Sequence, residues 1–247
     1  MLVNRLLPAA GILACLVAAP SLAGATPITW GAATNISGDA DVSTSGSLVG
    51  AFNIGGPGIA ATTVNGVVFS PFALSGTSAT NGNFTFTNAT GFGSNNSTGG
   101  SSAPFTSLSA GYQTLLSSVA GDFGTPSILT MSGLTAGNTY QFEWWTNSSN
   151  VLGESTAATD GSSISLSSNT GSGLGQFAIG TFVAGVGGTE TISFALGPNS
   201  PDYFLNGFQL RAVATPTAVP EPATMLLFGS GIAMVARRVR RQRRSNS

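Results

Sequence analysis

Thr-Tyr-Gln-Phe-Glu-Trp-Trp-Thr, residues 139–146, carries the clearest strand pattern in this 247-residue sequence. Successive side chains along a strand point to opposite faces of the sheet, so aromatic residues two apart line the same face. This alternation predicts a strand with one apolar face toward a core and a more polar face away from it. The two faces are Tyr140, Phe142 and Trp144 on the apolar side, and Gln141, Glu143 and Trp145 on the outer side.

Short runs of similar character lie on both sides of this strand and are separated by Gly, Asn, Ser and Pro. Asn65-Gly66 falls inside one of them and predicts either a tight hairpin turn or a bulge. Many short strands with frequent turns favour an antiparallel sandwich over a parallel α/β fold. We therefore predict an all-β fold, a two-layer antiparallel jelly-roll-like sandwich. The other expected strands are 28–30, 47–53, 62–69, 84–87, 127–131, 163–166, 176–183, 189–196 and 203–213.

Two segments of the body do not fit the strand pattern. Residues 90–102 are rich in Gly, Ser and Asn and predict an exposed loop. Apolar residues recur with helical spacing at Tyr112, Leu115, Leu116 and Val119. This spacing places all four on one helix face, so we expect a single helix in the body.

The last 28 residues form a separate unit of three parts in a fixed order. Pro220-Glu221-Pro222 is followed by an apolar run, residues 223–236, and then by six arginines. The prolines prevent a helix from extending backward, so a helix begins at about Ala223. A helix of fourteen residues is roughly 21 Å long, whereas the hydrocarbon core of a membrane is ~30 Å thick. The segment therefore predicts a short membrane helix whose arginine side chains must extend to the headgroups. The arginines are expected to stay on the cytoplasmic side.

This three-part order resembles the PEP-CTERM sorting signal of exported Gram-negative proteins. Alternative interpretations are an ordinary core helix or a basic tail that binds nucleic acid, but the latter leaves the apolar run without a role. The resemblance implies a partner, exosortase, with processing near the Pro-Glu-Pro motif and release to the cell surface or extracellular matrix. The motif residues are Pro220, Glu221, Pro222, Arg237, Arg238, Arg240 and Arg241.

The N-terminus predicts export as well. Arg5 precedes an apolar segment, residues 6–19, and Ala23-Gly24-Ala25 supplies small residues for cleavage before Thr26. We expect residues 1–25 to be a signal peptide handled by the Sec translocon and signal peptidase, with transient passage through the inner membrane. Residues 12–15, Ile-Leu-Ala-Cys, also resemble a bacterial lipobox, so lipidation at Cys15 is an alternative to cleavage at residue 25.

The composition of the body, between the predicted signal peptide and the sorting signal, excludes several kinds of site. Residues 26–219 contain one arginine against eight aspartate and glutamate residues, a formal charge of −7, and no lysine. Such an anionic domain is a poor partner for nucleic acid. The chain has no histidine and its single cysteine, Cys15, lies in the predicted signal peptide. Ser-His-Asp and Cys-His catalytic sites, disulfides and His- or Cys-based metal sites are therefore ruled out for the body.

Acidic side chains are the remaining candidates for chemistry. Asp39 and Asp41 begin a run of alternating oxygen-bearing residues, but Thr44 stands where an EF-hand needs glycine, which leaves only a looser calcium site as a candidate. Paired carboxylates are what a glycosidase requires. Nothing in the sequence places any two of the dispersed acids together, so we expect no enzyme. The acids considered are Glu143, Glu154, Asp160, Glu190 and Asp202.

The second half of the body, residues 127–213, also resembles malectin-like and galactose-binding-like modules in its turns and strands. This resemblance implies a jelly roll that often binds carbohydrate. We expect four segments: a signal peptide (1–25), a β-sandwich (26–214), a Pro-rich linker (215–222) and a membrane helix with its basic tail (223–247). The expected function is an exported structural surface protein. The alternative is a carbohydrate-binding module that stacks polysaccharide on Trp145, beside Gln141 and Glu143.

Overall fold

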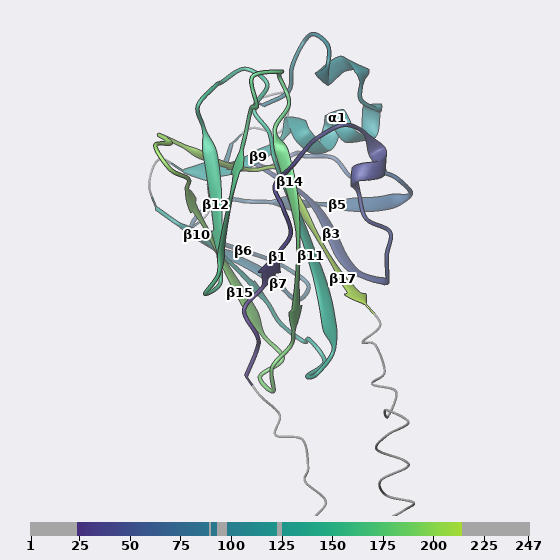
Figure 1. Ribbon diagram of the computed structural model, residues 1–247, viewed down its shortest axis with the longest axis vertical. Coiled ribbons are helices and arrows are strands. Elements are labelled where there is room, and N and C mark those ends of the chain that lie inside the picture. Colours follow the sequence, from purple (N-terminus) through teal and green to yellow (C-terminus); the bar gives the residue numbers. More distant parts are fainter. Residues whose placement is uncertain (1–23, 89, 93–97, 123–124, 214–247) are drawn as a thin grey trace, which may run out of the picture. The chain divides into compact units, whose positions relative to one another are not determined.

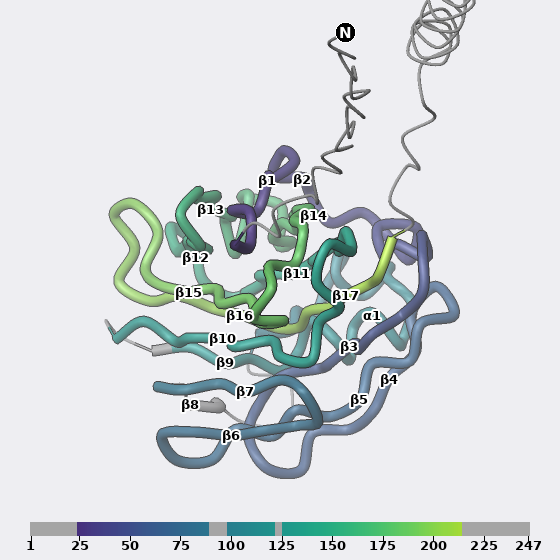
Figure 2. The backbone as a smooth tube through the Cα atoms, turned by 90° about the horizontal axis from the view of Figure 1, so that it is seen from below, coloured from purple at the N-terminus to yellow at the C-terminus, as the bar shows by residue number. Residues whose placement is uncertain are grey.

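The computed structural model describes residues 24–88, 90–92, 98–122 and 125–213 (Figure 1). Most of the predicted signal peptide, the linker and the C-terminal helix lie outside these ranges. Within them, two large β-sheets form facing layers, which confirms the predicted all-β sandwich. Figure 2 shows the strands of the two sheets along opposite sides of the body.

The larger sheet has eight strands, with β11, the aromatic strand of residues 139–146, near its centre. All its pairs are antiparallel except β3 with β5, which run parallel. β2 (Thr34–Asn35) pairs with β14 beside β1. The order is β1 (Thr29–Trp30), β14 (Gln176–Val183), β11 (Thr139–Thr146), β17 (Gly207–Val213), β3 (Ser47–Gly55), β5 (Val67–Ala73) and β4 (Thr62–Val64).

The second sheet has six strands, all paired antiparallel. Its order is β13 (Ser163–Ser167), β12 (Ser155–Thr159), β15 (Glu190–Leu196), β10 (Ser127–Met131), β7 (Phe84–Thr87) and β6 (Ser78–Asn81). A small third sheet joins β16 (Tyr203–Leu205), β9 (Val119–Asp122) and β8 (Thr90–Phe92). β8 lies within residues 90–102, so the prediction of a continuous loop there is wrong.

The main core fills the space between the two large sheets. On β11, Tyr140, Phe142 and Trp144 are buried in it, as the alternation of the strand predicted. Phe142 stacks on Phe208 of β17 with ring centroids 5.6 Å apart, and Trp144 meets Phe194 of the opposite sheet edge-on at 5.3 Å. Aromatic pairs of this kind add to the hydrophobic effect of burial, so the core ties β11 to both layers.

A second core lies on the outer face of the larger sheet. The helix α1 (Ala110–Ser117) covers that face, and its apolar side chains form a buried cluster with those of β11, β4 and β5. Tyr112, Leu115 and Leu116 are the buried residues that helical spacing predicted, whereas Val119 belongs to β9. Ser109 caps the helix, its hydroxyl accepting a hydrogen bond from the Tyr112 amide at 3.2 Å.

The turn at Asn65-Gly66 is a hairpin and not a bulge. Both residues have positive φ, 47° and 75°, as a type I′ turn requires, and the turn joins β4 to β5. The only other described helices are two 3-10 turns, η1 (Asp39–Asp41) and η2 (Phe105–Ser107). In the described part of the chain, no helix is long and apolar enough to cross a membrane.

Both ends of the described body lie at the same end of the larger sheet (Figure 1). The Thr26 amide donates to the Val183 carbonyl at 3.2 Å. Val183 pairs with Thr139, which pairs on its other side with Val213, so the three residues lie side by side on neighbouring strands. The N-terminal and C-terminal segments therefore join the sandwich at one end of it.

Candidate functional site

The outer face of β11 holds the three residues predicted to bind polysaccharide, and the structure encloses them. Trp145 is fully buried in the second core and meets Phe69 edge-on, with ring centroids 5.6 Å apart. Glu143 is only 1% exposed, and Gln141 is half-buried. The prediction of an exposed stacking platform at Trp145 is therefore wrong. The apolar face of α1 needs a surface to bury against, and the outer face of β11 supplies it.

Glu143 belongs to a network of polar side chains that fixes the segment before β3. Its Oε2 accepts hydrogen bonds from the Ser43 amide, at 3.1 Å, and from the Gln209 side chain. Arg211 donates to the Gln209 Oε1 at 3.2 Å and to three main-chain carbonyls of residues 44–46. Gln141 accepts from the Ser43 hydroxyl at 3.1 Å. These side chains are occupied in holding residues 43–46 on the sheet.

The buried position of Glu143 alters its acidity. Burial raises the pKa of Glu143 to about 7, against the opposing effect of the hydrogen bonds from Gln209 and Ser43. Its second oxygen, Oε1, is buried and has no hydrogen-bond partner among the described residues. A carboxyl in this position is substantially protonated at neutral pH.

The candidate calcium residues Asp39 and Asp41 lie in the 3-10 turn η1 and are used for local hydrogen bonds. Asp41 Oδ2 accepts from the Ser37 amide at 2.7 Å and from the Gly38 amide at 2.9 Å. Asp39 Oδ1 accepts from the Ser109 hydroxyl at 2.6 Å, which joins η1 to the cap of α1. The described residues contain no group of three or more His, Cys, Asp or Glu side chains that could hold a metal ion.

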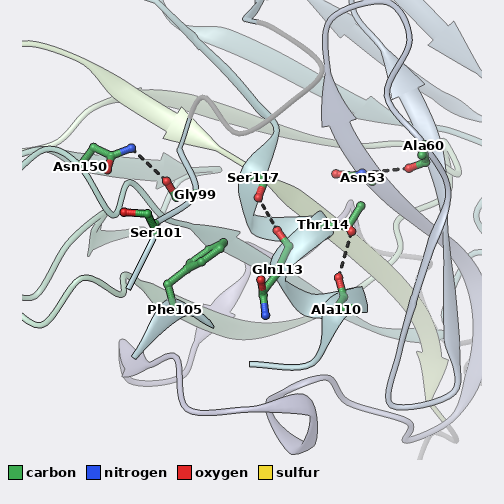
Figure 3. Close-up of a pocket in the computed structure, with 11 residues that line it drawn as sticks. Asn53, Ala60, Gly99, Ser101, Phe105, Ala110, Gln113, Thr114, Ser117 and Asn150 are labelled. Atoms are coloured by element: carbon green, nitrogen blue, oxygen red, sulfur yellow. Dashed lines mark hydrogen bonds between the residues drawn. The ribbon is translucent and has the colours of Figure 1, made fainter. Parts of the chain in front are cut away.

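A pocket of about 590 Å³ opens between α1, residues 99–101 and the loop after β11 (Figure 3). Figure 3 shows the ring of Phe105 between Ser101 and Gln113. None of the described residues that line the pocket is ionisable. They are Asn53, Ala60, Gly99, Gly100, Ser101, Phe105, Ala110, Gln113, Thr114, Ser117 and Asn150.

The pocket holds amide groups whose nitrogens are fixed and whose oxygens are open. The Gln113 Nε2 donates to the Leu108 carbonyl at 2.7 Å, and the Asn150 Nδ2 donates to the Gly99 carbonyl at 3.0 Å. No described residue donates to either side-chain oxygen. The pocket therefore presents oriented hydrogen-bond acceptors without charge. Sequence reasoning missed it because its residues come from five separate segments, none of which has a distinctive pattern.

Among the dispersed acids, the structure brings Glu154 and Asp202 together. Burial, the negative charge of Asp202 and the hydrogen-bonding contact between the two carboxyls raise the pKa of Glu154 to about 7. The two carboxyls of a glycosidase stand at least about 5 Å apart to leave room for the sugar or a water. Carboxyls in direct contact do not have that geometry.

The comparison with protein families concerns the tail. Residues 218–242 match the PEP-CTERM protein-sorting motif. The chain carries a PEP-CTERM sorting signal. This signal indicates an exported precursor that passes the membrane and is processed by exosortase. All of its predicted motif residues lie outside the described ranges, at least seven residues beyond the end of β17: Pro220, Glu221, Pro222, Arg237, Arg238, Arg240 and Arg241.

No curated protein matches the chain. Among solved structures, the chain is similar to Bacteroides uniformis beta-glucuronidase 2 covalently bound to cyclophellitol-6-carboxylate aziridine, with 14% identity and a TM-score of 0.41. The match covers 67% of this chain and 18% of that one, so the chain spans less than a fifth of that protein's length.

Proposed function

We propose that this PEP-CTERM protein is a structural component of the cell surface or extracellular matrix of a Gram-negative bacterium, with a non-catalytic β-sandwich. The observation that carries the proposal is the sorting motif at residues 218–242, directly after a folded body. The two polar residues first considered for binding, Gln141 and Glu143, support a structural role, because both accept hydrogen bonds within the body.

Export and processing are tested on the full-length chain, expressed in a bacterium with an exosortase and followed by cell fractionation and intact-mass measurement. The wild-type body is expected at the surface or in the medium, with a mass that lacks the basic tail. Glu221→Ala is expected to accumulate as a longer, membrane-bound form, because it changes the motif itself. Pro216→Ala, two residues outside the matched range, serves as the matched control. Surface protein that retains the full tail contradicts the proposal.

A second candidate function is the binding of a neutral saccharide in the pocket beside α1. The uncharged lining and the open carbonyl oxygens of Gln113 and Asn150 favour it, since sugar hydroxyls donate hydrogen bonds to such acceptors. Both chain termini join the body at the end of the sheet where β11 begins, at Thr139. The pocket lies beyond the other end of β11.

This candidate is tested with a glycan array and pull-down on insoluble polysaccharide. Ala110→Phe places a ring in the pocket without removing a side-chain hydrogen bond, so it is expected to abolish binding. Ser107→Phe, an exposed position in η2 that does not line the pocket, is the matched control and is expected to bind like wild type. Equal binding by both variants, or no binding by wild type, argues against a saccharide site here.

A further inference from the structure

One edge of the six-stranded sheet has main-chain groups without partners. β6 is the last strand of that sheet and pairs on one side only, with β7 (Figure 2). The Asn88 amide donates to the Thr77 carbonyl at 2.7 Å, which fixes the alternation of the ladder. Hydrogen-bonded pairs alternate with non-hydrogen-bonded ones, so the amides and carbonyls of Ser78 and Thr80 point away from β7. No described residue forms a hydrogen bond with these groups.

The other sheet edges are protected in ways that natural proteins use against edge pairing. α1 lies close against β4, since a Cβ atom at Gly111 would come within 2.0 Å of the Thr63 carbonyl oxygen. β1 and β2 have only two residues each. On β13, the Gln176 side chain accepts a hydrogen bond from the Ser167 amide at 2.8 Å. β6 has neither a charge nor a proline, and no described strand pairs with its free side.

The part of the chain around β6 is also uncharged. Residues 42–121 contain no Asp, Glu, Lys or Arg, although about one residue in four is charged in a typical domain. Across the sheet from β6, the first charged side chain is Glu190 on β15, which is only 7% exposed. Residues 26–219 have a formal charge of −7, so two copies of the body repel each other least through the β6 edge.

We propose that β6 is a self-association edge, where two copies of this chain pair their β6 strands antiparallel across a two-fold axis. Such an interface must be self-complementary. The register that engages all the free groups places Ser78 opposite Thr80 of the second copy, with Ala79 on the axis. Ala79 is half-buried against the main core, and the second copy covers its exposed part. The lack of acids favours a second anionic copy over a basic partner, which would be attracted to negative charge.

The test is measurement of molecular mass by light scattering and analytical ultracentrifugation, on the full-length chain in detergent over a concentration series. Wild type is expected to reach twice the monomer mass. Ser78→Pro removes an outward N–H but no bond to β7, so it is expected to remain monomeric. Ser78→Lys places two like charges across the axis and is expected to do the same. Circular dichroism checks that both variants are folded.

Ser165→Pro is the matched control, on the opposite edge of the same sheet. The Asp160 amide donates to the Ser162 carbonyl at 3.1 Å, so the ladder alternation turns the Ser165 amide outward as well. This variant is expected to dimerise like wild type. A wild type that stays monomeric at all concentrations overturns the proposal, and so do Ser78→Pro and Ser78→Lys variants that both dimerise like wild type, which would place the contact elsewhere, for example in the tail.

The register is tested by Ala79→Cys in a Cys15→Ala background. Two residues that face each other in a non-hydrogen-bonded pair have Cα atoms ~4.5 Å apart, within the range that a disulfide spans. Oxidation with copper phenanthroline is expected to link the two copies, as seen on a denaturing gel. Ser165→Cys in the same background is expected to stay unlinked. Failure of Ala79→Cys to crosslink overturns the proposed pairing. These outcomes are independent of sorting and of the saccharide pocket.

Discussion

Glu143 shows how one residue makes the stability of the body depend on pH. The group is buried, and burial raises its pKa in the folded state to about 7 from its ordinary value of 4.5. Below pH 4.5 the carboxyl is protonated in both states and has no effect. As the pH rises from 4.5 to 7, the unfolded chain loses the proton first, so the folded state loses relative stability. Complete ionisation of Glu143 lowers the free energy of unfolding by about 3 kcal/mol.

We therefore expect the melting temperature of the wild-type protein to fall between pH 5 and pH 8, and Glu143→Gln to reduce this fall. Gln is neutral throughout and keeps an oxygen to accept from Ser43 and Gln209. The measurement is thermal unfolding of both proteins across this range. Similar melting temperatures at pH 5, where Glu143 is protonated, provide the internal control. Parallel curves for the two proteins would show that Glu143 is not responsible.

At the scale of the element, β11 is a strand buried on both faces by different partners. Tyr140, Phe142 and Trp144 pack between the sheets, and Trp145 packs beneath α1. The alternation of its sequence correctly separated the two faces but could not show that the outer face is covered. One signal was available: a helix with an apolar face requires a partner, and the large outer-face tryptophan was the natural choice.

The β4–β5 hairpin illustrates the same division between local and distant information. The positive φ values that Asn65 and Gly66 adopt are a local property, and the residue types narrowed the prediction to a tight hairpin turn or a bulge. The parallel pairing of β5 with β3 depends on contacts between residues eighteen positions apart, such as Phe52 with Ser70. No local pattern encodes such a pairing.

At the scale of the whole molecule, the body is expected to be stable without its sorting tail. A chain that ends at Val219 keeps all described strands, because β17 ends at Val213. Its melting temperature is expected to equal that of the full-length chain, since every core contact among the described residues is kept. A drop of more than roughly 4 °C, on the order of 1–2 kcal/mol for a domain of this size, would show that the tail packs on the body. Thermal unfolding followed by circular dichroism measures the difference.

The sequence alone determined the fold class, most of the strands, the one helix and the sorting signal. Each of these depends on residues near one another along the chain: alternation of period two, helical spacing, turn residues, or the linear order Pro-Glu-Pro, apolar run and arginines. Exosortase processing is likewise indicated by a linear motif, residues 218–242, and needs no tertiary structure to be recognised.

Only the tertiary structure decided which side chains are accessible and which meet. It buried Trp145, placed Asp39 and Asp41 in local hydrogen bonds, and brought Glu154 to Asp202 across 48 positions of sequence. It also assembled the pocket around Gln113 from separated segments. The physical reason is that burial and contact depend on which elements pack together, and that choice is made by the summed free energy of the whole core, not by any one stretch of the chain.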